Sequence, residues 1–121
     1  MNIKAIALVV EDHPGQAVVF RTALQQVGFD AMIAPDGDDA SEKLERSTPQ
    51  LVLLDLHLPG VSGEEILKRI RNNERFDRTR VVIASADVEL ANSLEAEADE
   101  IIIKPINFND LKTLIQELKE E

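Results

Sequence analysis

The stretch LVLLDLHLPG, residues 51–60, decides the fold of this chain. Its first four residues are aliphatic without a break, which is typical of a short strand buried on both faces of a parallel sheet. The aliphatic run ends at Asp55, and Pro59 and Gly60 then turn the chain away. A strand of this kind that ends on a carboxylate predicts a charged side chain at the carboxyl end of the sheet.

Four more apolar runs lie along the chain, at residues 6–10, 31–34, 81–84 and 101–103. The segments between the runs have apolar residues at helical spacing. Pro14 suits the first position of a helix and Gly28 the end of one, while Gly37 and residues 107–110 mark further boundaries. Five strand–helix units with right-handed crossovers predict an α/β, doubly wound, five-stranded parallel sheet with five helices. Among the common strand orders of such sheets, we take 2-1-3-4-5 as the working one. This is a flavodoxin-like architecture.

Composition restricts the possible functions. The length of 121 residues predicts one domain, residues 1–121. A formal charge of −10 argues against a nucleic-acid partner, and the absence of cysteine excludes disulfides and thiolate metal sites. The sequence has no apolar stretch near the ~20 residues that span a bilayer, and its N-terminal apolar run is interpreted as a strand rather than a signal peptide. We therefore expect a cytoplasmic protein with no membrane segment.

Three acidic residues follow two of the predicted strands. Glu11 and Asp12 end the first strand, and Asp55 ends the third. In a sheet of order 2-1-3-4-5 the winding direction reverses between these strands, so the carboxylates should meet in one crevice. Like charges about 4 Å apart repel by roughly 4 kcal/mol at an effective dielectric constant near 20. The oxygen-only ligand set favours a hard divalent cation, and few carboxylates with room for water suit Mg²⁺.

Two further polar residues are predicted at the same edge of the sheet. Ser85 provides a hydroxyl group after the fourth strand, and Lys104 provides an ammonium group after the fifth. Neither is needed merely to hold a metal. A hydroxyl, a lysine and a metal around a carboxylate are suited to binding a phosphoryl group, with Asp55 as the nucleophile.

The motifs at these strand ends resemble those of the receiver domains of bacterial two-component response regulators. The resemblance covers essentially the whole chain, and it rests on Glu11-Asp12, on Asp55 with Pro59 and Gly63, on Ser85-Ala86 and on Lys104-Pro105. Each motif alone is weak, but together they occur in order at the ends of the expected strands.

This resemblance implies a role in a phosphorelay. Asp55 would accept a phosphoryl group from a sensor histidine kinase, a phosphotransfer protein or a small phosphodonor. The protein would catalyse only its own phosphorylation and dephosphorylation, so it is not expected to be a turnover enzyme. The family pattern makes Asp12, Asp55 and the backbone carbonyl of His57 direct magnesium ligands, with Glu11 acting through water.

The same pattern assigns the remaining residues around the phosphoryl group. Ser85 would donate a hydrogen bond to a phosphoryl oxygen, backbone amides near His57 and Ala86 would add donors, and Lys104 would pair with the phosphoryl charge. The Lys104-Pro105 peptide bond is expected to be cis, although X-Pro bonds are cis in only about 5% of cases.

Simpler interpretations stand beside these roles. Any one of the acids could cap a following helix. Ser85, taken by itself, is most simply interpreted as a helix N-cap. Lys104 could be a solvated lysine. The side chains of His57 and His13 are expected at the surface.

Two departures from the family pattern concern output. Receivers usually carry an aromatic residue three positions before the lysine, where this chain has Ile101, and the Ser85 to Lys104 spacing is shorter by about one helical turn. The usual glycine near Glu97 is also missing. We expect Ile101 to stay buried on activation and the output to be carried by residues 85–95.

Three alternatives remain open at this point. A pseudo-receiver would keep the fold as a phosphorylation-independent interaction module. A flavin-binding domain of the same topology would find no Trp or Tyr to stack on its ring. A metal-dependent phosphohydrolase usually needs a second acid two residues after the nucleophile, where this chain has His57.

The downstream partner is expected to be either a separate effector protein or a covalently attached output domain. Because no output segment follows the fifth predicted helix, the chain is expected to be a stand-alone regulator or a receiver cut from a longer protein.

Overall fold

The computed structural model describes residues 4–120 and contains one five-stranded parallel sheet. The strands are β1 (Ala5–Val10), β2 (Phe29–Ala34), β3 (Leu51–Leu54), β4 (Arg80–Ser85) and β5 (Glu100–Ile103). The helices are α1 (Pro14–Val27), α2 (Gly37–Arg46), α3 (Gly63–Arg71), α4 (Val88–Ser93) and α5 (Phe108–Glu120). The sheet order is β2-β1-β3-β4-β5, so the predicted α/β architecture is confirmed.

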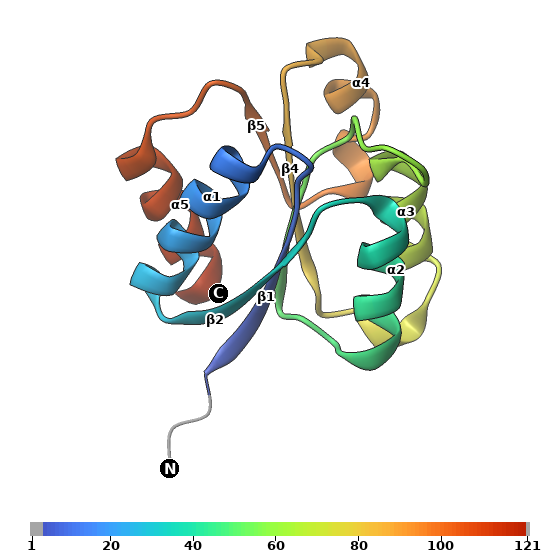
Figure 1. Ribbon diagram of the computed structural model, residues 1–121, viewed down its shortest axis with the longest axis horizontal. Helices are drawn as coiled ribbons and strands as arrows, with labels where there is room; N and C mark the ends of the chain where they lie inside the picture. The colour runs from blue at the N-terminus through green and yellow to red at the C-terminus, as the bar shows by residue number, and fades with distance from the viewer. Residues whose placement is uncertain (1–3, 121) are drawn as a thin grey trace.

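The helices cover the sheet on both faces. Figure 1 shows α1 and α5 on one side of the sheet and α2 and α3 on the other. Alternate residues of β1 therefore enter different cores: Ala7 and Val9 pack with α1 and α5, while Leu8 and Val10 pack with α2, α3 and α4. All four are fully buried, which explains why the strand is apolar at consecutive positions.

The register of the strands aligns the ends of β1 and β3. Val10 pairs with Leu54, and the backbone N–H of Asp55 donates to the carbonyl oxygen of Val10 at 2.9 Å. The N–H of Glu11 in turn donates to the carbonyl oxygen of Ala34 on β2 at 3.1 Å. Residues that directly follow β1 and β3 are therefore neighbours at the carboxyl edge of the sheet.

The predicted helix boundaries agree with the structure at α1. Pro14 is its first residue, and His13 is its N-cap, with Nδ1 accepting a hydrogen bond from the N–H of Gln16 at 3.1 Å. Gly28 ends the helix in the left-handed region, at φ 105°, where a side chain would be strained.

The connection between β4 and β5 contains two short helical elements. The α4 helix has only six residues, and the chain then tightens into a 3₁₀ turn, η2 (Glu95–Glu97). Leu94 lies at the junction, as the C-cap of α4 and the N-cap of η2. A second 3₁₀ turn, η1 (Glu74–Phe76), was not predicted and buries Phe76 before β4.

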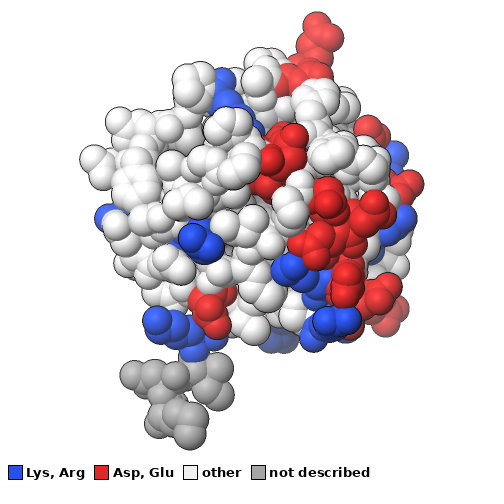
Figure 2. Space-filling model, in the orientation of Figure 1, with Lys and Arg blue, Asp and Glu red and all other residues white. Residues whose placement is uncertain are grey.

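Charged side chains are unevenly distributed over the surface. Figure 2 shows acidic side chains gathered on the side of the molecule where α2 lies. Asp36 caps α2, and Asp38 and Asp39 lie in its first turn, where acids favour the helix dipole. Among the described residues, no helix has the length and the apolar character that crossing a membrane requires.

Candidate functional site

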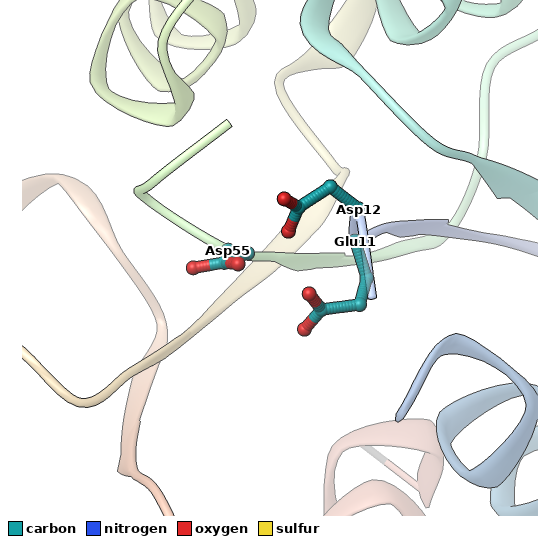
Figure 3. Close-up of side chains that lie close together, drawn as sticks. All are labelled: Glu11, Asp12 and Asp55. Atoms are coloured by element: carbon teal, nitrogen blue, oxygen red, sulfur yellow. The ribbon is translucent and has the colours of Figure 1, made fainter. Parts of the chain in front are cut away.

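The structure brings the three predicted carboxylates together. Glu11 and Asp12 follow β1 and Asp55 follows β3, and one oxygen from each lies within 4.8 Å of the others. Figure 3 shows the carboxyl groups of Glu11 and Asp12 pointing toward the side on which Asp55 lies. Glu11 and Asp55 are buried, with 2% and 8% of their surface exposed, whereas Asp12 is exposed. The cluster therefore reaches solvent through Asp12.

Lys104 joins this cluster from the end of β5. Its Nζ atom lies 2.7 Å from Oε1 of Glu11, 2.6 Å from Oε1 of Gln16 and 3.6 Å from Oδ2 of Asp55. The side chain is only 14% exposed, so the alternative of a solvated lysine is wrong. The Lys104-Pro105 peptide bond is cis, as the resemblance implied.

The cluster carries excess negative charge. Burial raises the pKa of the Glu11 carboxyl, and the nearby Asp55 charge raises it further, while the Lys104 ammonium and the backbone N–H of His13 act in the opposite direction. Three carboxylates therefore face one ammonium group. Oxygen ligands in an acidic, partly solvated cluster fit a divalent cation such as Mg²⁺, so the residues could hold the ion that the sequence predicted.

Ser85 ends β4 and is fully buried. Its Oγ atom accepts a hydrogen bond from the backbone N–H of Asp87 at 3.0 Å. Asp87, rather than Ser85, is the N-cap of α4, and its Oδ1 atom accepts from the N–H of Leu90 at 3.0 Å. The interpretation of Ser85 as a helix cap is therefore wrong, because the cap lies two residues further along the chain.

His57 lies at the surface, as predicted, with 64% of its side chain exposed. Its Nε2 atom lies 3.2 Å from Oδ2 of Asp87, so the pair bridges the segments that follow β3 and β4. The backbone N–H of His57 also donates to Oδ1 of Asp55 at 3.2 Å. The hydrogen bond from Leu90 and the His57 ring both lower the pKa of the Asp87 carboxyl.

The three carboxylates, His57 and Lys104 line one open pocket of about 430 Å³, whereas Ser85 is not among its lining residues. Two of its lining residues, His13 and Gln16, were not predicted as site residues. Gln16 lies in the first turn of α1, and its side chain meets Lys104, which is 88 residues away in the sequence. The only sequence signal for it was its position four residues after Asp12, next to a strand end.

Ile101, at the position usually aromatic in receivers, is partly buried on β5. It packs against the core formed with α2, α3 and α4. On the surface it lines a groove of about 290 Å³ with Asn92, Ile103 and acidic neighbours. Its behaviour on activation stays a prediction.

The model of the response regulator receiver domain family matches residues 7–116. The chain belongs to this family. A receiver domain of a putative LuxO repressor protein from Vibrio parahaemolyticus has 36% sequence identity and a TM-score of 0.86, over 98% of this chain and 92% of that one. Response regulator TrrA from Thermotoga maritima, solved in complex with Mg²⁺-BeF, has 30% identity and a TM-score of 0.83, over 94% and 98% of the two chains.

Curated relatives differ in how much of their length this receiver matches. A probable methanogenesis regulatory protein, FilR2 of Methanothrix harundinacea, is 36% identical over 95% of this chain and 81% of its own length. The sensory transduction protein RegX3 of Mycolicibacterium smegmatis is 34% identical over 86% of this chain but only 46% of its own length. The receiver thus spans about half of the second protein. Family membership places the chain among signalling modules rather than metabolic enzymes.

Proposed function

We propose that this receiver domain, residues 1–121, accepts a phosphoryl group on Asp55 in a phosphorelay. The observation that carries the proposal is the position of Asp55 within one pocket. It lies beside Glu11 and Asp12, with Lys104 Nζ at 3.6 Å from its Oδ2 atom. A carboxylate with acidic neighbours on one side and an ammonium group on the other suits a nucleophile that acquires a phosphoryl group.

The transfer step follows from the chemistry of the donor. A carboxylate oxygen of Asp55 attacks the phosphorus of a phosphohistidine, the P–N bond breaks, and the imidazole nitrogen keeps the electron pair and takes up a proton. Lys104 and the Ser85 hydroxyl then donate to phosphoryl oxygens. In the dephosphorylation step, water attacks the phosphorus, the P–O bond to Asp55 breaks, and inorganic phosphate leaves.

Magnesium is the proposed cofactor. Asp12, Asp55 and the backbone carbonyl of His57 would hold it directly, and Glu11 would act through water. When bound, the ion supplies positive charge that offsets the carboxylates and the phosphoryl oxygens. The oxygen-only cluster and the Mg²⁺-BeF complex of TrrA, at 30% identity, support this assignment.

The proposed phosphodonor is a sensor histidine kinase or a phosphotransfer protein in the cytoplasm. The proposed downstream partner is a separate effector protein or an attached output domain. A relative from Rhizobium meliloti that is 32% identical, the phosphate regulon transcriptional regulatory protein PhoB, is matched over 49% of its length, which supports the second form.

Mass measurement of the intact protein tests the acceptor. Wild type is incubated with Mg²⁺ and acetyl phosphate beside Asp55→Asn, with Asp77→Asn, in the loop before β4, as a matched control. Wild type and Asp77→Asn should each gain one acid-stable, base-labile phosphoryl group, and Asp55→Asn should gain none. Equal labelling of all three proteins would exclude Asp55, and no labelling of wild type would favour the pseudo-receiver.

A further inference from the structure

Four residues form a closed ring of hydrogen bonds at the carboxyl end of the sheet. Lys104 Nζ donates to Oε1 of Glu11 at 2.7 Å and to Oε1 of Gln16 at 2.6 Å. The backbone N–H of Gln16 donates to Nδ1 of His13 at 3.1 Å, and the N–H of His13 donates to Oε2 of Glu11 at 3.2 Å. The ring therefore joins the end of β1, the first turn of α1 and the end of β5.

The ring directs two hydrogen bonds of Lys104 to Glu11 and Gln16, whereas its contact with the proposed acceptor is a longer ion pair. An ammonium group has three N–H donors, and two of them point to Glu11 and Gln16. The distance of 3.6 Å to Oδ2 of Asp55 is longer than a hydrogen bond. In the unphosphorylated protein the lysine is thus near Asp55 but bonded elsewhere.

The two acceptors of Lys104 differ in charge. Glu11 is a buried carboxylate, whereas Gln16 offers an uncharged amide oxygen and is half-buried at the edge of the pocket. Hydrogen bonds between an ammonium group and a charged oxygen are stronger than those to a neutral one. When a phosphoryl group carries charge beside Lys104, the bond to Gln16 is therefore the one that exchanges most readily.

We propose that Gln16 is a positioning residue that retains Lys104 in the resting receiver and so limits how readily Asp55 takes up a phosphoryl group. This inference deepens the proposed function and rests on it. Loss of the amide oxygen frees Lys104 to turn toward Asp55 and favours the phosphorylated state. A carboxylate at the same position binds Lys104 more strongly and has the opposite effect.

The test compares Gln16→Leu, Gln16→Ala and Gln16→Glu with wild type, and Gln26→Leu on the exposed part of α1 is the matched control. One readout is the extent to which an amine-reactive acylating reagent modifies Lys104 in the absence of added metal. This extent is quantified by peptide mass spectrometry. The other is the concentration of beryllium fluoride that half-saturates the protein with Mg²⁺, followed by amide chemical shifts. Each variant is also made in a Lys104→Met background.

Gln16→Leu and Gln16→Ala should raise acylation of Lys104 and lower the half-saturating beryllium fluoride concentration roughly fivefold, as expected for one hydrogen bond of average net strength. Gln16→Glu should do the reverse, and Gln26→Leu should match wild type. In the Lys104→Met background the substitutions at Gln16 should have no effect on beryllium fluoride binding, which a merely structural role would not produce.

Unchanged acylation in both Gln16→Leu and Gln16→Ala would overturn the proposal, as would equal effects with and without Lys104. If wild type itself does not bind beryllium fluoride, the proposed phosphoryl site fails. The acylation of Lys104 then decides separately whether Gln16 retains the lysine.

Discussion

Two charged clusters lie at opposite ends of the sheet, and they are built on different principles. At the amino end of β4 and β5, the guanidinium group of Arg71 donates to Oδ2 of Asp99 at 2.8 Å and to the carbonyl oxygens of Glu97 and Thr79 at 2.7 and 3.0 Å. At the carboxyl end, three carboxylates meet one ammonium group. In the first cluster, the guanidinium group finds its hydrogen-bond acceptors within the fold. In the second, the carboxylates still repel one another, and a bound cation could relieve this repulsion.

The difference separates stability from function. Asp99 also accepts from the backbone N–H of Val81 at 2.7 Å, so the Arg71 cluster fixes the short β4–β5 connection to α3. Among residues 4–120, no comparable contact holds Asp12, which is exposed. Sites that violate the usual rules of charge compensation are those where a fold gives up stability for binding or chemistry.

Removing Arg71 should produce the largest change in stability. Arg71→Ala deletes three hydrogen bonds and leaves the partly buried Asp99 without its 2.8 Å partner. We expect the free energy of unfolding to fall by about 2–3 kcal/mol in urea titrations. The control is Arg46→Ala, which breaks an exposed pair with Glu42 and should change stability by less than about 0.5 kcal/mol. Equal effects of the two substitutions would contradict the assigned role of the cluster.

Magnesium binding at the carboxyl end of the sheet should stabilise the folded protein. Binding to the folded state alone adds about 1.4 kcal/mol when the free ion is at ten times its dissociation constant. Asp12→Ala should weaken this response, because one of the three clustered carboxylates is lost. Arg71→Ala should retain it, since the two clusters are separate. Thermal melts with and without millimolar MgCl₂ measure the effect, and equal shifts in wild type and Asp12→Ala would exclude a shared metal site.

Glu11→Gln should show how the excess negative charge of the carboxyl-end cluster affects the free energy of unfolding. The folded state raises the pKa of this carboxyl, so the folded protein binds the proton more tightly than the unfolded chain does. Stability is therefore lost as the pH rises from the ordinary glutamate pKa to the raised value, and the loss persists at neutral pH. Without added metal, Glu11→Gln should be more stable than wild type at pH 7.

This advantage of Glu11→Gln should disappear below the ordinary glutamate pKa, where both proteins carry a neutral side chain. Urea titrations across the pH range follow the difference. A stability difference that stays constant with pH would show that the ionisation of Glu11 is not its cause.

The sequence predicted the carboxyl-end cluster far better than the amino-end cluster. Strand order places Glu11, Asp12 and Asp55 together because each lies within two residues of the end of a strand, and the carboxyl ends of parallel strands share one edge. Arg71 has no such marker, because its partners are mostly backbone carbonyls whose directions depend on the path of the chain.

The same limit applies to Gln16 and to the tight turn after α4. The contact of Gln16 with Lys104 depends on where α1 lies relative to β5, which helical spacing alone does not specify. The change to 3₁₀ geometry at Leu94 depends on the short distance that remains before β5 begins. Local patterns predict elements and strand ends, whereas side-chain contacts between elements require the packed structure.

The smallest expected effect concerns the exposed bridge over the carboxyl-end cluster. His57 and Asp87 join the segments after β3 and β4 at 3.2 Å, beside the Asp55 pocket. Both groups are partly or largely exposed, so the bridge should contribute little to stability. His57→Ala keeps the backbone carbonyl that we propose as a magnesium ligand, and it should therefore leave phosphorylation by acetyl phosphate nearly unchanged.

Opening the bridge should instead admit water to the acyl phosphate and shorten its lifetime a few-fold. Asp87→Ser keeps a side-chain oxygen that can cap α4 but is too short to reach His57, so it should have the same effect. The double variant with His57→Ala should decay no faster than either single variant, because the two residues act as one unit. Glu89→Ala, in the first turn of α4, is the matched control and should decay like wild type. Decay of the phosphorylated protein is followed by intact mass after removal of the donor. Additive effects of the two substitutions would mean that each residue acts on the water independently, and unchanged decay in all variants would mean that the bridge does not cover the site.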